Sequence, residues 1–434
     1  MSVTRTFDIL KRYAEKFPDK ADALTPKRNG EWKGFSTQDY IDTAHHLSYG
    51  LMEMGFQKGD KIATVSNNRP EWNMSDHGLA MVGIVHVPLF ATLEQDGYRE
   101  ILNHSDAQIV IVSDESLHKK IAPLVNEIPH LKEIYTIEPV EGVKQWQEIV
   151  DLGKANADKH KEELERIKES ISPKDCVTLI YTSGTTGNSK GVLLSHENLV
   201  SNFTKVAEVF GMTPDQRYLC ILPLCHVGER MANYSAQYSG ASIYYAQNMG
   251  TIADDLKEVK PHAFGTVPRI LEKIYEKVVQ RGAALKGMKK KMFFWALNLG
   301  HDFDVKGKSG WYKWQHKQAS KLIFSKWREA IGGNIQSVGV GGAALQPRLE
   351  RVFWAAGVKL LNMYGLTETS PVCTIQRLDH IKMGTVGSLL EGVDVRIADD
   401  GEILVKGPNV MMGYYNKPEK TAEVFKEIEG VRWF

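Results

Sequence analysis

Residues 179–191 read Leu-Ile-Tyr-Thr-Ser-Gly-Thr-Thr-Gly-Asn-Ser-Lys-Gly, and this stretch decides the fold class. Its first residues are apolar or β-branched, which predicts a buried strand that runs directly into a loop of glycines and small hydroxyl residues. Gly184 and Gly187 allow the backbone to turn with positive φ, so that its N–H groups approach an anion closely. Side chains add four hydroxyl donors and one positive charge: Thr182, Ser183, Thr185, Thr186 and Lys190. A strand that ends in such a loop predicts a site for the oxygens of a polyphosphate in an α/β protein.

The loop differs from the Walker pattern of phosphoryl-transferring NTPases. With Gly184 as the first glycine, that pattern requires glycine at position 189 and Ser or Thr after the lysine. The sequence has Ser189 and Gly191 instead, so the hydroxyl that binds Mg²⁺ in that class is missing. A flexible connection is the alternative for a lone Gly/Ser/Thr loop, but four hydroxyl residues and a terminal lysine favour phosphate binding.

Short β-branched runs alternate with helical periods along most of the chain. This alternation is typical of layered βαβ units with parallel or mixed sheets. Asp399-Asp400-Gly401 predicts a hairpin and a smaller antiparallel β subdomain. Strands are predicted at 61–65, 84–89, 107–112, 177–181, 242–246, 337–340, 358–362, 393–398 and 402–406, and helices at 70–81 and from 115. We expect three units: an α/β subdomain with a charged linker at 1–170, an α/β subdomain with the phosphate loop at 171–380, and a β-rich subdomain at 381–434.

Composition is that of an ordinary globular protein and excludes several function classes. The 434 residues carry a net charge of +1, which creates no overall field that favours nucleic acid. The four cysteines have neither the spacing of metal ligands nor the density of a disulfide framework. Residues 1–10 lack the apolar core of a signal peptide, and the most apolar stretch, 79–93, is too short to span a bilayer. We therefore expect a cytoplasmic protein that binds no nucleic acid.

Residues 281–330 differ from the rest of the chain in charge. They contain twelve Lys or Arg against three Asp or Glu, together with four of the nine tryptophans. Basic residues interleaved with aromatic rings suit an anionic membrane surface, because cations meet headgroups while rings lie at the interface. A helical insertion with an aromatic core and solvated lysines is the alternative. Peripheral contact with the inner face of the membrane is thus an open expectation.

Four motifs together resemble the adenylate-forming (AMP-binding) superfamily, which includes acyl-CoA synthetases. Residues 181–191 resemble its phosphate-loop signature, and residues 362–371, Asn-Met-Tyr-Gly-Leu-Thr-Glu-Thr-Ser-Pro, resemble its Tyr-Gly-x-Thr-Glu motif. Residues 341–345, Gly-Gly-Ala-Ala-Leu, match the turn that borders the adenine site, and residues 401–415 resemble a further glycine-containing element. The resemblance extends from about residue 40 to the end of the chain. It implies the layered α/β fold, and the sequence around residues 222–230 and 266–275 is most similar to long-chain fatty acid–CoA ligases.

The resemblance implies roles for particular residues. Tyr364 would lie against adenine, Thr367 would contact the α-phosphate, and Glu368 would hold Mg²⁺, which prefers carboxylate and phosphate oxygens. Lys190 would neutralise the departing pyrophosphate, and His226 would orient the substrate carboxylate unless it is simply a satisfied core histidine. The full nucleotide site would comprise Thr182, Ser183, Gly184, Thr185, Thr186, Gly187, Lys190, Gly341, Gly342, Ala343, Ala344, Asn362, Tyr364, Gly365 and Thr367, and the acyl pocket would comprise His226, Gly384, Thr385, Val386 and Gly387.

The implied reaction has two steps. ATP, with Mg²⁺, would activate a fatty acid to acyl-AMP with release of pyrophosphate, and CoA would then accept the acyl group. Transfer to a carrier protein, as in fatty acyl-AMP ligases, is one alternative. A non-enzymatic membrane-associated scaffold is another, although a scaffold has no need of a phosphate loop together with Glu368.

Two departures from the family pattern bear on these expectations. The residues after His226 include no counterpart of the tryptophan that gates the acyl tunnel in some long-chain members, so the sequence predicts no chain length. The sequence ends at Val431-Arg-Trp-Phe434, where the family continues to a ribose-binding aspartate, a hinge and a small domain that carries the adenylation lysine. On the resemblance, residues 1–434 should fold alone and bind adenine nucleotide, with thioester synthesis nearly absent.

Overall fold

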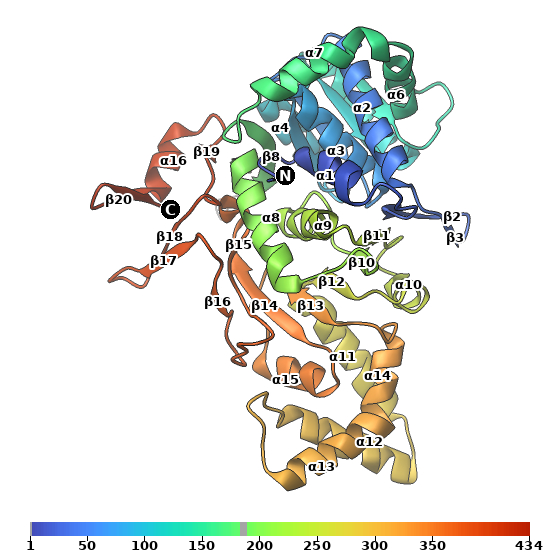
Figure 1. The fold of residues 1–434 in the computed structure, drawn as a ribbon, viewed down its shortest axis with the longest axis vertical. Coiled ribbons are helices and arrows are strands. Elements are labelled where there is room, and N and C mark those ends of the chain that lie inside the picture. The colour runs from blue at the N-terminus through green and yellow to red at the C-terminus, as the bar shows by residue number, and fades with distance from the viewer. Residues whose placement is uncertain (1, 183–188) are drawn as a thin grey trace.

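Two large sheets with mostly parallel strands organise the chain, and helices cover them (Figure 1). The computed structural model describes residues 2–182 and 189–434. One sheet has seven strands in the order β19-β9-β8-β5-β4-β6-β7, and the other has eight in the order β1-β11-β10-β12-β13-β14-β15-β16. The predicted α/β class with layered sheets is confirmed.

The seven-stranded sheet forms around a strand–helix alternation that the sequence predicts well. Helix α3 begins at Pro70, a residue suited to the first helical position, and ends at Gly83 with φ of 81°. The strands are β4 (Lys61–Val65), β5 (Val85–Leu89), β6 (Ile109–Val112), β7 (Glu133–Thr136), β8 (Cys176–Thr182), β9 (Lys190–Ser195) and β19 (Gly413–Tyr414). The helices of the same region are α2 (Thr37–Glu53), α3 (Pro70–Val82), α4 (Gln95–Ser105), α5 (Glu115–Ile121), η1 (Ala122–Asn126), α6 (Trp146–Ala155) and α7 (Ala157–Ser170).

The eight-stranded sheet is parallel from β1 to β14 and antiparallel from there to β16. Its strands are β1 (Leu24–Thr25), β10 (Arg217–Cys220), β11 (Ser242–Tyr245), β12 (Ala263–Thr266), β13 (Ser337–Val340), β14 (Leu360–Gly365), β15 (Val372–Ile375) and β16 (Ser388–Leu389). Its helices are α1 (Asp8–Lys16), α8 (His196–Phe210), α9 (Val227–Ser239), α10 (Ile252–Val259), α11 (Pro268–Ala283), α15 (Pro347–Ala355) and the turn η3 (Thr367–Thr369).

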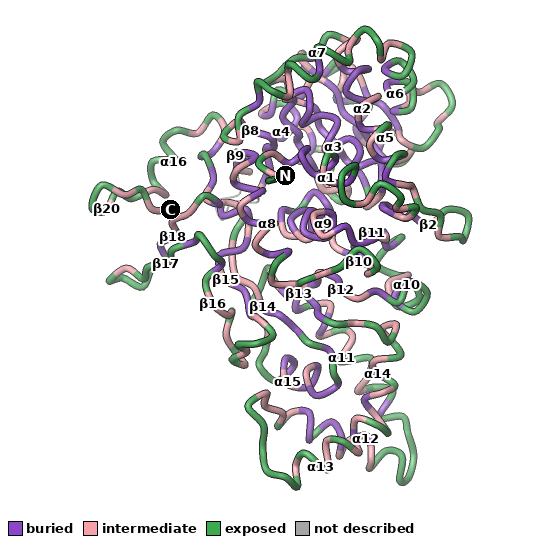
Figure 2. The backbone as a smooth tube through the Cα atoms, in the orientation of Figure 1, coloured by how far each residue is buried: buried purple, intermediate pink, exposed green. Residues whose placement is uncertain are grey.

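The main hydrophobic core joins the two sheets through α8 and α9. Phe203 of α8 and Tyr234 of α9 are fully buried beside residues of both sheets. Figure 2 shows buried backbone concentrated around these helices and the strands, with exposed backbone along the outer helices and hairpins. A buried junction of this kind suits a site that draws residues from both sheets.

The predicted division at residue 170 does not separate the sheets. Strands β8 and β9, which follow residue 170, belong to the seven-stranded sheet, whereas β1 near the N-terminus pairs with β11 in the other sheet. The physical reason is that backbone pairing joins strands distant in sequence, which local composition does not reveal. The division of the chain into three units at 1–170, 171–380 and 381–434 therefore stays a prediction.

Three small antiparallel hairpins lie outside the two large sheets, two of them in the C-terminal part of the chain and one near its N-terminus. The predicted Asp399-Asp400-Gly401 turn joins β17 (Asp394–Ile397) to β18 (Ile403–Lys406), as expected. A second hairpin pairs β20 (Lys426–Ile428) with β21 (Val431–Trp433), a third pairs β2 (Lys27–Arg28) with β3 (Glu31–Trp32), and α16 (Pro418–Val424) lies near β19.

The basic-aromatic stretch is a helical unit at one end of the long axis (Figure 1). It contains α12 (Gly287–His301), α13 (Gly310–Ala319), the π-helical turn η2 (Ser320–Phe324) and α14 (Ser325–Ala330). Phe293, Phe324 and Trp327 form a small core there, but Trp311 and Trp314 are 64% and 52% exposed. Over the described ranges, no helix is both long enough and apolar enough to cross a membrane.

Candidate active site

A cavity of about 800 Å³ opens at the carboxyl ends of the parallel strands of the eight-stranded sheet. Ligand sites in open α/β sheets commonly occupy this position. Helices α8 and α9 supply one wall, strands β12 to β14 supply another, and the ends of β8 and β9 reach the same space. The cavity therefore collects residues from both sheets.

Nine of the predicted site residues line this one cavity. They come from segments far apart in the sequence: Thr182, Lys190, His226, Gly341, Gly342, Tyr364, Gly365, Thr367 and Glu368. Of the others, Ser183, Gly184, Thr185, Thr186 and Gly187 lie outside the residues that the structure describes.

The remaining predicted residues lie outside the described lining of the cavity. Ala343, Ala344 and Asn362 adjoin it in sequence only. The segment 384–387 forms a turn in which Gly384 donates its N–H to Glu350 Oε2 over 2.6 Å, and the carbonyl of Thr385 accepts from Asn362 Nδ2 over 3.3 Å. Contact of Gly384, Thr385, Val386 and Gly387 with an acyl chain has no support in this geometry and stays a prediction.

Tyr414 connects the two charged residues at the polar end of the cavity. Its hydroxyl donates to Glu368 Oε1 over 2.8 Å, and Lys190 Nζ lies 5.1 Å from its ring centroid. Tyr414 sits opposite Val192 because β19 pairs with β9, next to the end of the phosphate loop. Burial and the charge of Glu368 raise the pKa of Tyr414, so its phenol stays a hydrogen-bond donor. Tyr414 lies within the glycine-containing element 401–415, but the motif itself indicates no role for this residue.

Gly365 allows the Tyr364–Glu368 segment to turn tightly into the cavity. A Cβ at this position would lie 1.6 Å from the carbonyl oxygen of Pro371, so no other residue fits this backbone path. Thr367 and Glu368 follow in η3, where the Met411 N–H donates to the Glu368 carbonyl over 2.8 Å. The turn therefore positions Glu368 at the cavity, where its carboxylate and Lys190 both lie against Tyr414.

His226 caps the start of α9 and faces the cavity. Its Nδ1 accepts the Gly228 N–H over 3.0 Å, which leaves Nε2 as the protonated nitrogen of the neutral ring. His226 is exposed toward the cavity that it lines, and partial desolvation by the surrounding protein lowers its pKa. At neutral pH the Nε2–H is thus free to donate to a carboxylate oxygen in the cavity.

The cavity behind His226 is lined largely by apolar side chains. Val206, Ala207, Phe210 and Met212 come from α8 and the turn after it, and the further apolar wall comprises Met231, Ala232, Ala236, Ala263 and Phe264. An alkyl chain that enters this space leaves water, which is favourable in proportion to the apolar area buried. The cavity therefore combines a polar, cation-bearing end with an apolar interior.

Glu368 is the residue that the sequence analysis assigns to Mg²⁺. Across residues 2–182 and 189–434, no group of three or more His, Cys, Asp or Glu side chains is arranged to hold a metal ion. A single carboxylate fits Mg²⁺ that is held mainly by phosphate oxygens and water. A role for Glu368 as a Mg²⁺ ligand stays a prediction.

The sequence is similar to a known enzyme family and to several of its members. The family model described as "AMP-binding enzyme" matches residues 10–415. The chain is 32% identical over 407 residues to long-chain-fatty-acid–CoA ligase FadD15 of Mycobacterium bovis, covering 92% of this chain and 66% of that protein. It is 31% identical to long-chain-fatty-acid–CoA ligase ACSBG2 of Xenopus laevis, covering 93% and 57% respectively. The chain thus spans about two thirds or less of the length of these relatives.

Solved structures agree with the fold. A crystal structure of a long-chain-fatty-acid-CoA ligase (FadD1) from Archaeoglobus fulgidus matches with a TM-score of 0.77 at 19% identity, over 99% of this chain and 80% of that chain. The N-terminal domain of FACL13 from Mycobacterium tuberculosis matches with a TM-score of 0.71 at 19% identity, over 100% and 95%. At this level of identity the match supports the fold.

Proposed function

Because the chain belongs to the AMP-binding enzyme family, we propose that it activates a fatty acid with ATP to give acyl-AMP and pyrophosphate, and that CoA then accepts the acyl group. The observation that carries the proposal is the single cavity that joins Lys190 and Glu368 to an apolar interior of the kind an alkyl chain fills. The names of the relatives, which are long-chain fatty acid–CoA ligases, support the same substrate class.

The residues of the cavity divide the chemistry between them. The His226 Nε2–H holds the substrate carboxylate at the boundary between the polar and apolar parts, so that its oxygen faces the α-phosphorus of ATP. Lys190 and Thr182 donate to the pyrophosphate as the P–O bond to it breaks, and Tyr364 lies against adenine. Mg²⁺, when bound at Glu368, supplies positive charge to the phosphate oxygens. The carboxylate of Glu368 is kept in position by Tyr414.

A panel of carboxylates in an ATP–pyrophosphate exchange assay tests the first step. We expect exchange with fatty acids of medium or long chain and little exchange with acetate or amino acids, because only alkyl chains gain from burial in the apolar interior. Addition of CoA or of a carrier protein with a free pantetheine thiol then distinguishes the ligase from the carrier-protein alternative. Exchange that is fastest with a small polar acid would contradict the proposed substrate class.

We also propose that the helical unit 281–330 contacts an anionic membrane surface. Trp311 and Trp314 stack with their ring centroids 4.9 Å apart on the exposed side of α13. Lys317 and Lys321 follow at spacings that place them along the same side of the helix. Exposed indole rings beside ammonium groups suit the interface and the headgroups of anionic lipid.

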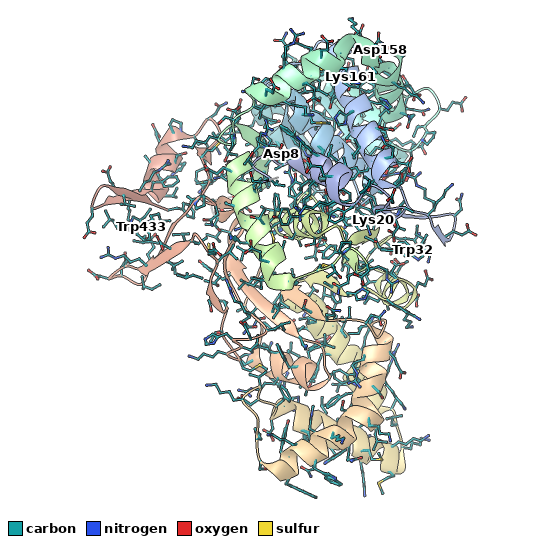
Figure 3. The ribbon with its side chains drawn as sticks, in the orientation of Figure 1. Asp8, Lys20, Trp32, Asp158, Lys161 and Trp433 are labelled. Carbon is teal, nitrogen blue, oxygen red and sulfur yellow. The ribbon has the colours of Figure 1, made fainter. Side chains whose placement is uncertain are left out.

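Vesicle sedimentation tests the membrane contact. We expect binding to phosphatidylserine-containing vesicles that weakens as salt rises, because screened Coulomb attraction supplies much of the energy. Lys317→Glu/Lys321→Glu should reduce this binding several-fold. Lys161→Glu, on α7 at the opposite end of the molecule (Figure 3), is a control for a charge reversal elsewhere on the surface, and Lys317→Glu alone matches its change in charge. Equal, weak binding to neutral and anionic vesicles at low salt would favour a purely structural insertion.

A further inference from the structure

The main chain of Ser189, directly before Lys190, is held by side chains from two distant parts of the chain. Its N–H donates to Glu100 Oε1 over 3.2 Å, and its carbonyl accepts from Lys417 Nζ over 2.9 Å. Glu100 belongs to α4, 89 residues earlier, and Lys417 directly precedes α16, 228 residues later. The two charged side chains therefore form a clamp on the main chain that leads into β9.

Lys417 is itself held by the turn that opens α16. The Lys417 N–H donates to the Tyr414 carbonyl over 3.2 Å, and the Lys417 carbonyl accepts from the N–H and the hydroxyl of Thr421, each over 3.0 Å. Two residues earlier, the Tyr415 N–H donates to the Gly191 carbonyl over 2.8 Å. The backbone that carries Lys417 is thus already aligned with β9. Its ammonium therefore reaches the main chain before β9 with less loss of conformational freedom than it would have on a free segment.

The same segment also reaches Glu368 at the polar end of the cavity. The Met411 N–H donates to the Glu368 carbonyl and the Tyr414 hydroxyl donates to its carboxylate, each over 2.8 Å. Residues 411–417 therefore connect the end of the phosphate loop to Glu368 through hydrogen bonds on both sides. Lys417 itself lies outside the described lining of the cavity.

We propose that Lys417 and Glu100 are positioning residues for the binding of the ATP phosphates, because they fix the main chain at Ser189 and hence the direction from which Lys190 enters the cavity. The inference rests on the proposed function, since it assigns supporting residues to the same nucleotide site. A misplacement of about 1 Å is enough to weaken such contacts strongly. Neither positioning residue lines the cavity, so the clamp acts on the pyrophosphate part of ATP through the loop and leaves adenine and the acyl chain unaffected.

Calorimetry with ATP and with AMP, both in the presence of Mg²⁺, tests the inference without relying on turnover. Lys417→Met keeps the length of the side chain but removes the donor, so ATP should bind about 10-fold more weakly, the effect of one charge-assisted hydrogen bond. The affinities for AMP and for fatty acid should stay unchanged. Lys417→Arg retains a donor and should recover most of the ATP affinity. A general loss of folding would weaken all three ligands together and would lower the urea midpoint of the variant.

Glu100 separates positioning from a simple effect of charge. If only the electrostatic field mattered, removal of a negative charge near the phosphate loop would strengthen the binding of an anionic nucleotide. The clamp predicts the opposite sign: Glu100→Ala should weaken ATP binding several-fold, because the Ser189 N–H loses its acceptor. Glu100→Gln still offers a carbonyl oxygen and should bind ATP nearly as tightly as the wild type.

Lys420→Met is the matched control, because it removes one ammonium from α16 whose partner is the exposed Glu423. It should leave the ratio of ATP affinity to AMP affinity at the wild-type value. An unchanged ratio in Lys417→Met, a higher ratio in Glu100→Ala, or equal losses in the two lysine variants would overturn the inference alone. Shifted ratios without ATP–pyrophosphate exchange for any fatty acid would overturn the proposed reaction and leave the clamp in place. Failure of ATP to bind the wild-type chain would overturn both.

Discussion

Lys190→Ala and Glu368→Gln should each slow acyl-adenylate formation by about 10²–10³-fold, with fatty-acid affinity nearly unchanged. Both side chains lie at the polar end of the cavity, joined through Tyr414, and neither belongs to the apolar wall. They therefore act on charge that develops on the phosphates as pyrophosphate leaves, which is an effect on the transition state. Single-turnover formation of acyl-AMP and calorimetry with the fatty acid measure the two quantities separately.

A matched pair of variants controls for the loss of charge. Lys420 and Glu423 form an exposed ion pair on α16, with Nζ and Oε1 2.8 Å apart. Lys420→Ala and Glu423→Gln change the net charge in the same way but lie outside the cavity, so they should leave acyl-AMP formation intact. If the Lys190 and Glu368 variants lost fatty-acid affinity while adenylation proceeded at the normal rate, the assignment of both residues to the phosphates would be wrong.

Local signals explain why most elements were predictable from the sequence. The strand at 61–65 coincides with β4, and the helix predicted at 70–81 corresponds to α3, because β-branched runs, Pro70 and Gly83 mark their ends strongly. The hairpin at Asp399-Asp400-Gly401 was predictable for the same reason, because the turn residues themselves mark it. Strand order was not predictable, since β8 and β9 join strands from the first third of the chain through pairing that leaves no local trace.

In the site, too, residues within short motifs were predictable, whereas residues whose position depends on strand pairing were not. Lys190, Tyr364 and Glu368 could be selected from the sequence because each lies in a short signature with its own turn chemistry. All three line one cavity, and their roles stay predictions. Tyr414 was missed because its role depends on the pairing of β19 with β9.

Asp76→Ala should lower the free energy of unfolding by about 3–5 kcal/mol. Asp76 is 1% exposed on α3 and accepts hydrogen bonds from Arg230 and Tyr234 of α9, while His86 of β5 lies 2.7 Å away through Nδ1. Asp76 and Arg230 are 154 residues apart in the chain, so this network ties the two sheets together. Removing the carboxylate leaves the Arg230 guanidinium buried without its counter-charge, which is the costly way to break a buried ion pair.

Urea unfolding of three variants separates this effect from the loss of any ion pair. Asp96→Ala removes a carboxylate that is 93% exposed and pairs with Arg99, so it should cost far less because water replaces the interaction. Asp76→Ala combined with Arg230→Met should recover part of the lost stability, since it removes the orphaned charge and fills its volume with an apolar side chain. Equal stability of Asp76→Ala and Asp96→Ala would contradict this account of the buried network. A double variant less stable than Asp76→Ala would show instead that Arg230 contributes through Thr178, whose hydroxyl it reaches over 2.7 Å.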